Sequence, residues 1–444
     1  MPASPARAAA FDILLRVERE SSYASELLHS NAFATLSTPD HALTTELVMG
    51  VLRWRSLLDE AIFRASSLKK LDVEVLIALR LALYQFRYLD RIPYRAALHE
   101  SVELVKRARK SSAAPFVNAV LRKLANNPPC SSAPSVVNFS SVQSLADAYA
   151  HPVWLVERWA KAFGLAAAEK VCQHDQTIPG TTLRLRTPEA ESELSAEGIS
   201  LEPGDLLGSA LRVKVGDVTK TKSFRSGHVV IQDEASQLIA ALVGRGHKQI
   251  LDCCAAPGGK TLAIADQNPD ATITAVEIHP HRARLMQKLL PESSQRIQIL
   301  TADVRDFLLT ESFDRILADV PCSGTGTLAR NPEIKWRLQP DDLRELRDRQ
   351  LAILRSAVSH LAPGGCVIYS TCSMEKEENE DVVEQALKED GSLRLRDCRA
   401  ELDRLRSTEI LIWPYPASLT QGPYLRTIPG THPCDGFFAA ILER

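Results

Sequence analysis

The hydrophobic pattern of the first 126 residues is helical. Apolar residues recur at spacings of three and four, and strand-like alternation is almost absent. This period places the apolar side chains on one face of a helix. It predicts helices over residues 8–17, 45–58, 71–86, 96–108 and 116–124. We therefore expect an all-α N-terminal domain over residues 1–127.

The pattern changes after this helical region. Residues 127–141 (NPPCSSAPSVVNFSS) are rich in Pro and Ser, which is typical of a linker. Residues 142–225 predict a small α+β module of the RNA-binding type, whose role as a substrate platform or as a spacer the sequence leaves open. Its helix-like segments and strand candidates are 153–163, 166–174, 181–186 and 210–215.

Residues 226–444 have a third pattern, in which apolar strands alternate with helical stretches. The expected strands are 249–253, 271–277, 297–301, 314–319, 365–370 and 436–442. Such alternation predicts an α/β domain with a doubly wound, mostly parallel, Rossmann-like sheet. Ligands bind beyond the carboxyl ends of the strands in sheets of this kind. The loops that follow the strands are therefore where we expect chemistry.

Composition and charge exclude several classes of protein. The chain has 444 residues, of which 45% are hydrophobic and 24% charged, so we expect two or three globular domains rather than disorder, a collagen-like repeat or a coiled-coil rod. No uncharged apolar run approaches the ~20 residues of a membrane span, and the charged N-terminus makes a poor signal peptide. We expect a cytoplasmic protein with no membrane partner.

The overall net charge of −2 carries no nucleic-acid signal, but the charge is unevenly distributed. Residues 80–123 hold ten basic and three acidic side chains. This stretch fits an RNA-facing surface and equally a solvated helix face.

The nine cysteines are odd in number and spread along the chain, with no C-x-x-C pair and no His at zinc-finger spacing. We expect neither disulfides nor a metal site.

The first candidate site follows the strand 249–253. The chain passes there from LDCC directly into AAPGGKT and a helix. Glycines let the backbone approach a ligand closely, although an ordinary strand-to-helix turn has the same pattern. A phosphate-binding P-loop would require glycine at position 254, where this chain has Cys254, so an ATPase is disfavoured.

Acids follow the next two strands. Glu277 lies 25 residues beyond Asp252, near the offset of an acid that binds ribose hydroxyls. Asp303 follows the third strand, where a carboxylate can meet an adenine amino group. Each acid alone is more typical of a helix cap or a surface charge. Together with the glycine-rich turn they favour a cofactor that contains a nucleoside.

Two cysteines follow neighbouring strands. Cys322 lies in ADVPCSGTG after the fourth strand, and Cys372 lies in YSTCS after the fifth. A thiol becomes a nucleophile when its pKa is lowered by a nearby cation or helix N-terminus. A pair of packed, inert thiols is the alternative.

These motifs carry a resemblance to a known family. LDCCAAPGGKT, ADVPCSGTGTLARNPEIKW, YSTCSMEKEEN and DGFFAAIL resemble the RNA 5-methylcytosine methyltransferases of the RsmB/Sun/Fmu family, within the NOL1/NOP2/Sun superfamily, and the likeness covers roughly residues 225–444. The helical N-terminus resembles a NusB-like RNA-binding domain. The resemblance implies S-adenosyl-L-methionine as cofactor and 16S ribosomal RNA as partner and substrate, and it implies no obligate protein partner.

The resemblance also assigns roles to residues of this sequence. Cys372 is the implied nucleophile that adds to C6 of cytosine, Asp319 holds the exocyclic amine and N3 of the base, and Cys322 assists product release. The implied cofactor contacts are Cys254, Ala255, Ala256, Pro257, Gly258, Gly259, Lys260, Glu277, Asp303 and Asp319. Many relatives carry Asp where this chain has Glu277, whose longer side chain should still reach a ribose.

Four further residues beyond the D-x-P-C motif have two readings. They are candidates for contact with RNA phosphate or for stacking on a base, and a plain surface loop explains them nearly as well. They are Arg330, Lys335, Trp336 and Arg337.

Several other functions compete with an rRNA methyltransferase. A DNA cytosine methyltransferase would use Cys322 as its nucleophile and leave Cys372 idle, and the T-C-S motif argues against it. A dehydrogenase would need G-x-G-x-x-G after the first strand. A 5-methylcytosine methyltransferase acting on 23S rRNA or tRNA, and a non-catalytic NusB-like RNA-binding adaptor, stay as alternatives.

Overall fold

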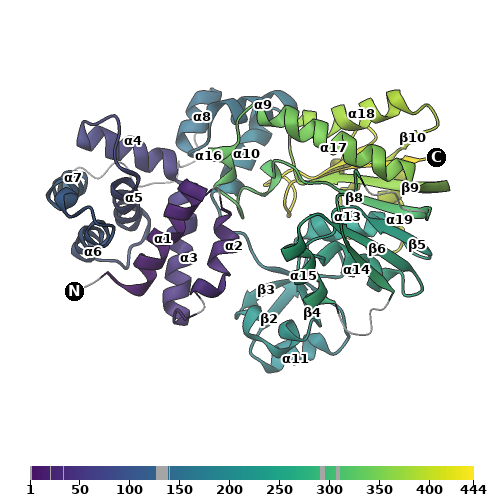
Figure 1. Ribbon diagram of the computed structural model, residues 1–444, viewed down its shortest axis with the longest axis horizontal. Helices are drawn as coiled ribbons and strands as arrows, with labels where there is room; N and C mark the ends of the chain where they lie inside the picture. The colour runs from purple at the N-terminus through teal and green to yellow at the C-terminus, as the bar shows by residue number, and fades with distance from the viewer. Residues whose placement is uncertain are drawn as a thin grey trace. The chain divides into compact units, whose positions relative to one another are not determined.

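The computed structural model describes residues 3–20, 22–33, 35–126, 139, 141–290, 296–306 and 311–444. The chain divides into two compact units, whose elements are labelled in Figure 1. The first unit contains Met1–Ile178 and Leu328–Arg337, and the second contains Pro179–Thr327 and Leu338–Arg444. A ten-residue segment that follows the D-x-P-C motif therefore belongs to the first unit, although the residues on both sides of it belong to the second.

The N-terminal part of the first unit is helical, as the sequence predicts. Its helices are α1 (Pro5–Glu20), α2 (Ala24–Leu28), α3 (Thr38–Arg53), α4 (Arg55–Ser66), α5 (Val73–Tyr88), α6 (Tyr94–Arg107) and α7 (Ala114–Asn126). Helix α5 is central, since it packs against α1, α3, α4, α6 and α7. Gly50 lets α3 approach α5 closely, because a Cβ there would lie 1.9 Å from Cζ of Tyr84.

The segment 45–58, predicted as one helix, is divided between two. Helix α3 ends at Arg53 and α4 begins at Arg55, with Trp54 between them at φ −101° and ψ 15°. The indole of Trp54 stacks on the ring of Tyr88 with centroids 5.0 Å apart. The apolar period continues across the break, so periodicity alone could not locate it.

Residues 142–178 complete the first unit. They form α8 (Val142–Ala148), α9 (Val153–Phe163) and α10 (Leu165–Asp175). The side chain of Gln176 donates a hydrogen bond to the carbonyl of Arg53, at 3.1 Å, and so ties the end of α10 to the end of α3. The predicted module 142–225 is thus divided between the two units. The predicted linker lies outside the described residues, except for Phe139 and Ser141.

The second unit begins with a small antiparallel sheet of order β2-β3-β1-β4. Its strands are β1 (Thr182–Leu185), β2 (Ser200–Pro203), β3 (Ala210–Val215) and β4 (Val229–Ile231), accompanied by the helices α11 (Ala190–Ala196) and α12 (Lys222–Arg225). Strands β1 and β3 confirm the two strands predicted for this region.

The large sheet of the second unit has the order β11-β12-β13-β9-β8-β5-β6-β7. Strands β5 (Gln249–Asp252), β6 (Thr272–Glu277), β7 (Ile297–Thr301), β8 (Phe313–Asp319) and β9 (Leu361–Thr371) are parallel. An antiparallel extension is made by β10 (Arg394–Arg396), β11 (Thr420–Gln421), β12 (Tyr424–Arg426) and β13 (Phe438–Glu443). The predicted α/β class with a mostly parallel sheet is confirmed.

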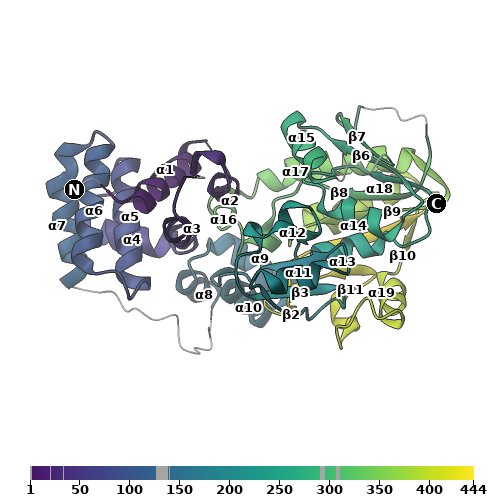
Figure 2. The same ribbon diagram turned by 90° about the horizontal axis from the view of Figure 1, so that it is seen from below.

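Helices cover both faces of this sheet (Figures 1 and 2). Alternate residues of a strand point to opposite faces, so Ile368 of β9 joins one apolar core and its neighbours Val367 and Tyr369 join the other. The first core contains residues of α13 (Glu234–Leu242), α14 (Gly259–Gln267) and α19 (Cys398–Ser407). The second contains residues of α17 (Asp342–Ser359) and α18 (Glu380–Glu389). No helix within the described ranges is long and apolar enough to cross a membrane.

Candidate active site

The strand order of the large sheet reverses between β5 and β8. From β5 the chain continues to β6 and β7 on one side, whereas β8 and β9 extend the sheet on the other. This reversal is a topological switch point, beyond which ligands bind in open α/β sheets. The loops after β5, β8 and β9 carry the glycine-rich motif, the D-x-P-C motif and the T-C-S motif, so the structure brings all three to one edge.

The two motif cysteines meet at this edge. The Sγ atoms of Cys322 and Cys372 lie 3.2 Å apart. Both thiols are free, as are the other described cysteines, while Cys130 lies outside the described residues. The hydrogen bond to Cys372, burial and the negative charges of Cys372 and Glu378 raise the pKa of Cys322 well above its usual value. At this distance the two thiols share a hydrogen bond in which either sulfur can be the donor.

Close backbone packing holds the loops around the thiols together. The amide of Gly326 donates to the carbonyl of Cys372 at 2.9 Å, and the amide of Gly436 donates to the carbonyl of Gly326 at 2.8 Å. A Cβ on Gly326 would lie 2.1 Å from the oxygen of Gly436, so only glycine fits there. The terminal DGFF motif is thereby part of the wall of the site.

Asp319, at the end of β8, is fixed by two partners. Its Oδ2 lies 2.8 Å from Nζ of Lys260, and its Oδ1 accepts a hydrogen bond from the hydroxyl of Ser370 at 2.7 Å. Burial opposes the charge of Lys260, but the attraction of Asp319, Cys372 and Asp252 outweighs it and raises the pKa of Lys260. Lys260 also lies over the ring of Phe437, 5.1 Å from its centroid. The lysine of the glycine-rich loop thus faces the catalytic candidates.

The glycine-rich turn leaves a buried acceptor without a partner. Gly258 has φ +106°, and a Cβ there would lie 2.9 Å from Cγ of Met286 on α15 (Pro280–Leu289). Asp252 is 1% exposed, and its Oδ2 accepts a hydrogen bond from Thr261 at 2.6 Å. Its Oδ1 has no hydrogen-bond partner among the residues that the structure describes. Burial raises the pKa of Asp252 to about 6. Asp252 was not among the site residues predicted from the sequence, although its place at the strand end before the glycine-rich loop was a usable signal.

The remaining cofactor candidates lie along β5, β6 and β7. Glu277 is buried at the end of β6, and its carboxylate accepts the amide of His279 at 2.8 Å. Asp303 follows β7 and is paired with Arg305, which lowers the pKa of its carboxyl. Burial, followed by the nearby Cys253 and Asp252, raises the pKa of Cys254 well above its usual value, so this thiol is unreactive.

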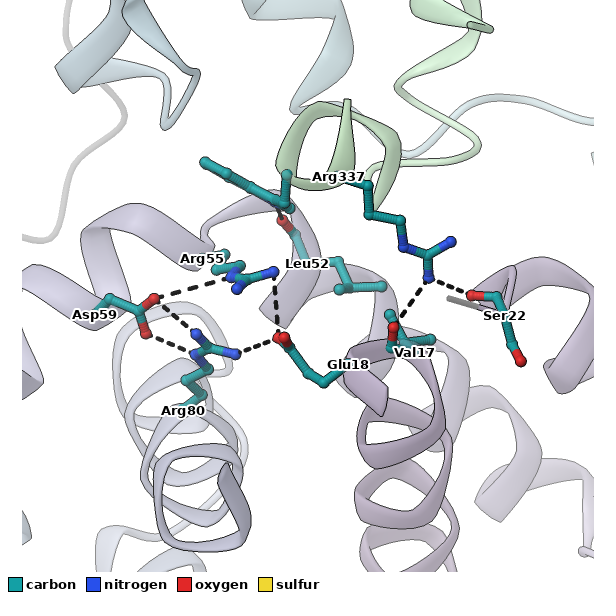
Figure 3. Close-up of polar contacts among 9 residues, drawn as sticks. Val17, Glu18, Ser22, Leu52, Arg55, Asp59, Arg80 and Arg337 are labelled. Carbon is teal, nitrogen blue, oxygen red and sulfur yellow. Dashed lines mark hydrogen bonds and ion pairs between the residues drawn. The ribbon is translucent and has the colours of Figure 1, made fainter. Parts of the chain in front are cut away.

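The residues Lys335, Trp336 and Arg337 are structural contacts of the first unit, which corrects their reading as an RNA-contacting or plain surface loop. Trp336 Nε1 donates to the carbonyl of Leu52 at 2.6 Å. Arg337 donates to the carbonyls of Val17, at 3.2 Å, and Ser22 (Figure 3).

Lys335 is the most buried of these three side chains. It is 1% exposed, and its ammonium group donates to the carbonyl of Arg53 at 3.0 Å. Burial lowers the pKa of Lys335 to about 7. Arg330 is half-buried.

The basic stretch 80–123 separates into paired and exposed side chains. Arg80 is 3% exposed and binds Asp59 and Glu18 (Figure 3), so it faces the interior rather than a ligand. The other side chains paired with an acid are Lys106, Arg107 and Lys110. Exposed side chains for which the described residues provide no ion-pair partner are Arg91, Arg95, Arg109, Arg122 and Lys123, the last of which donates to the carbonyl of Ala65.

The fold and the site together define a Rossmann-like methyltransferase with a cysteine pair at its switch point. The family model described as 16S rRNA methyltransferase RsmB/F matches residues 239–443, and the model described as NusB family matches residues 4–126. The chain is 36% identical to the "Probable ribosomal RNA small subunit methyltransferase B" of Bacillus subtilis, over 100% of both chains. It is 31% identical to the "Ribosomal RNA small subunit methyltransferase B" of Vibrio cholerae, over 91% of this chain and 90% of the relative. The chain therefore belongs to the RsmB/F family of methyltransferases.

Solved structures support the same fold. The structure titled "Crystal Structure of PH0851" has a TM-score of 0.80 at 22% identity and covers 100% of this chain and 99% of its own. The structure of NSun6 from Pyrococcus horikoshii has a TM-score of 0.54 at 19% identity, covering 66% of this chain and 98% of its own. At these identities the likeness concerns the architecture alone.

Proposed function

We propose that the protein transfers a methyl group from S-adenosyl-L-methionine to C5 of a cytosine in 16S ribosomal RNA, through a covalent adduct between Cys372 and C6 of the base. The observation that carries this proposal is the pair of thiols, 3.2 Å apart, on loops that follow the strand ends where Ser370 binds Asp319. Carbon 5 of cytosine is a poor nucleophile until a group adds to C6. A thiolate beside a second thiol can both make and release such an adduct.

The charges around the two thiols support Cys372 as the nucleophile. The positive charge of Lys260 interacts with Cys372, whereas the carboxylate of Glu378 interacts with Cys322. The thiolate is the reactive form of cysteine, and a cation favours it while an anion disfavours it. An enzyme that used Cys322 for attack, as in the DNA-type arrangement, would have this electrostatic pattern reversed.

Asp319 is placed to hold the base while Cys372 attacks. A carboxylate has about four lone-pair sites, and Lys260 and Ser370 occupy two of those on Asp319. The remaining sites can accept the exocyclic amine of cytosine and share a proton with N3. As the Cys372–C6 bond forms, electron density moves toward N3, and a proton held there stabilises it. After methylation, Cys322 assists loss of the C5 proton and elimination of Cys372.

The residues after β5 and β6 fit the proposed cofactor. S-adenosyl-L-methionine supplies an electrophilic methyl group and carries an amino group, a ribose and an adenine. The unpartnered Oδ1 of Asp252 is a buried acceptor that an amino group would satisfy. The Cys254–Lys260 loop is proposed to contact the methionine part of the cofactor, Glu277 is proposed to hold the ribose, and Asp303 is proposed to lie near the adenine.

The proposed substrate rests on the family and on the exposed arginines of the N-terminal unit. The Bacillus subtilis relative is named as a methyltransferase of small-subunit ribosomal RNA, and the N-terminal region matches the NusB family. Arg91, Arg95, Arg109 and Arg122 are the candidate phosphate contacts. Because ribosomal RNA is made and assembled in the bacterial cytoplasm, we propose that compartment for the protein.

Transfer of labelled methyl to unmodified 16S rRNA tests the proposal, with the modified base mapped. We expect one labelled cytosine C5 with wild type, none with Cys372→Ala, and an RNA adduct stable to denaturation with Cys322→Ala. The control is Cys366→Ala, in the middle of β9 and away from the loop that carries Cys372, which should keep activity. If the adduct accumulated in Cys372→Ala instead, Cys322 would be the nucleophile and Cys372 the residue that assists release. Labelling of 23S rRNA or tRNA alone would refute the substrate, and no transfer to any RNA would favour the adaptor.

A further inference from the structure

Glu378 is a buried carboxylate held between the loops that carry the two thiols. It ends the short helical turn Lys376–Glu378 before α18 and is 0% exposed. Its Oε1 accepts the backbone amide of Ser323 at 2.8 Å and the side-chain amide of Gln350 at 2.8 Å. Its Oε2 accepts the hydroxyl of Ser323 and, at 2.5 Å, the hydroxyl of Ser373. One side chain thus binds the residue directly after Cys322 and the residue directly after Cys372.

Two neighbours of Glu378 hold the other sides of the same loops. Gln350 of α17 donates to the carbonyl of Pro321, at 2.9 Å, directly before Cys322. Asn379 accepts the hydroxyl of Thr371 at 2.6 Å and donates to the carbonyl of Ser373 at 2.9 Å. Each cysteine is therefore flanked by anchored residues on both sides, and Glu378 connects the two sets of anchors.

The charge of Glu378 is satisfied by hydrogen-bond donors rather than by a cation. Four donors reach its carboxylate, and it takes part in no ion pair among the described residues. The negative charge of Glu378 acts on Cys322 and favours the protonated thiol there. The same residue therefore has a geometric and an electrostatic effect on the pair.

We propose that Glu378 is a positioning residue that sets the distance between Cys322 and Cys372 and keeps the two thiols chemically different. The part of this inference that concerns turnover rests on the proposed function. The part that concerns the thiols does not, because it applies to the protein without RNA or cofactor. Glu378 contacts no reacting atom, and it acts through Ser323 and Ser373.

Alkylation of the thiols tests the inference without any substrate. The full-length protein is treated with iodoacetamide at pH 8, and the peptides containing Cys322 and Cys372 are quantified by mass spectrometry. In wild type we expect Cys372 to react at least about tenfold faster than Cys322, since thiolate fraction controls the rate. In Glu378→Gln the ratio should fall several-fold, because one of the negative charges that favour the protonated thiol of Cys322 is removed and the anchor between the two loops is weakened. Glu378→Asp keeps the charge and should preserve most of the ratio.

The matched control is Glu384→Gln, which removes an exposed carboxylate from α18. It should leave the labelling ratio unchanged. An equal ratio in wild type and Glu378→Gln would overturn the inference. If Glu378→Gln fails to fold, Ser323→Ala removes one hydroxyl donor and keeps the backbone hydrogen bond. That variant should change the ratio in the same direction by a smaller factor, and an unchanged ratio in a folded Ser323→Ala would also overturn the inference.

Turnover gives a second readout. In Glu378→Gln we expect methyl transfer at saturating RNA to fall about 10- to 100-fold with KM for RNA within about threefold, and adduct to accumulate as Cys322 becomes misplaced. Partial rescue by Glu378→Asp supports positioning. If Glu378→Gln turned over at the wild-type rate, the positioning role of Glu378 would be overturned. Inactive wild-type enzyme would refute the proposed function, while the alkylation result would still decide the role of Glu378.

Discussion

The ammonium group of Lys260 lies 2.8 Å from the carboxylate of Asp319 and joins the loop after β5 to the end of β8. Lys260 belongs to the glycine-rich motif, for which the family resemblance implies contact with the cofactor. In the structure its charge interacts with the proposed base-binding acid, with Cys372 and with Asp252. The lysine is therefore placed to connect cofactor binding to the chemistry on the base.

Replacing Lys260 should impair catalysis more than folding. In Lys260→Met, Asp319 loses the cation that compensates it and Cys372 loses a nearby positive charge, so we expect kcat/KM for RNA methylation to fall about 100-fold. Lys260→Arg keeps the charge and should recover part of this loss. Lys248→Met is the control, since Lys248 is 69% exposed and lies 3.7 Å from Asp270. Equal kinetics in Lys260→Met and Lys248→Met would show that the ion pair has no catalytic role.

The sequence predicted the order and ends of the catalytic strands because each end is marked by its own motif. Strand β8 ends at Asp319 and β9 at Thr371, directly before the loops that carry the thiols. Parallel strands then bring these loops to one edge without further information. The predicted class of the domain and its candidate cysteines followed from that local signal.

Contacts between distant segments could not be predicted in the same way. Lys335 follows a motif loop and is surrounded in sequence by charged residues, so it resembles a surface residue. Its burial depends on the carbonyl of Arg53, far away in the chain. The role of Glu378 was missed for a related reason. The run MEKEEN contains three acids, and only the packed structure shows that Glu375 and Glu378 are buried and that Glu378 binds the residues after both cysteines.

The ionised carboxylate of Asp252 should lower the stability of the ligand-free protein while it favours binding of the cofactor. Its folded-state pKa of about 6 lies above the unfolded value of about 3.9. The folded protein therefore binds this proton more tightly, and the contribution of Asp252 to the free energy of unfolding falls as pH rises from about 4 to about 6. Above that range the ionised carboxylate costs about 3 kcal/mol.

The variant Asp252→Asn tests this cost. Without ligand, its melting temperature should exceed that of wild type at pH 7.5, and the difference should shrink as the pH is lowered toward 4.5. Its affinity for S-adenosyl-L-methionine should fall, because the carboxylate proposed to bind the amino group is lost. Calorimetric titration measures the second effect. If Asp252→Asn melted at a lower temperature than wild type at pH 7.5, the predicted cost of the buried charge would be contradicted.

Arg80 should be a stability residue of the N-terminal unit. It is 3% exposed and lies 2.6 Å from Asp59 and 2.7 Å from Glu18. Removing one member of a buried ion-pair network leaves its partners uncompensated and typically costs 3–5 kcal/mol. We therefore expect Arg80→Met to lower the melting temperature strongly. Arg64→Met is the control, since the exposed pair with Glu60 should contribute less than about 1 kcal/mol. Similar melting temperatures for both variants would contradict the buried network.

The exposed arginines should carry the salt-dependent part of RNA binding. The triple variant Arg91→Gln, Arg95→Gln, Arg122→Gln removes cations for which the described residues provide no ion-pair partner. If each contacts one phosphate of a single-stranded region, the slope of log affinity against log salt should decrease by about 2. The matched control replaces Lys106, Arg107 and Lys110, each paired with an acid, by Gln. Both variants lose the same net charge. A larger loss of RNA affinity and of salt slope in the arginine variant would therefore assign RNA contact to those arginines. Equal losses in the two variants would mean that only the overall charge of the unit matters, and the proposed phosphate contacts would be wrong.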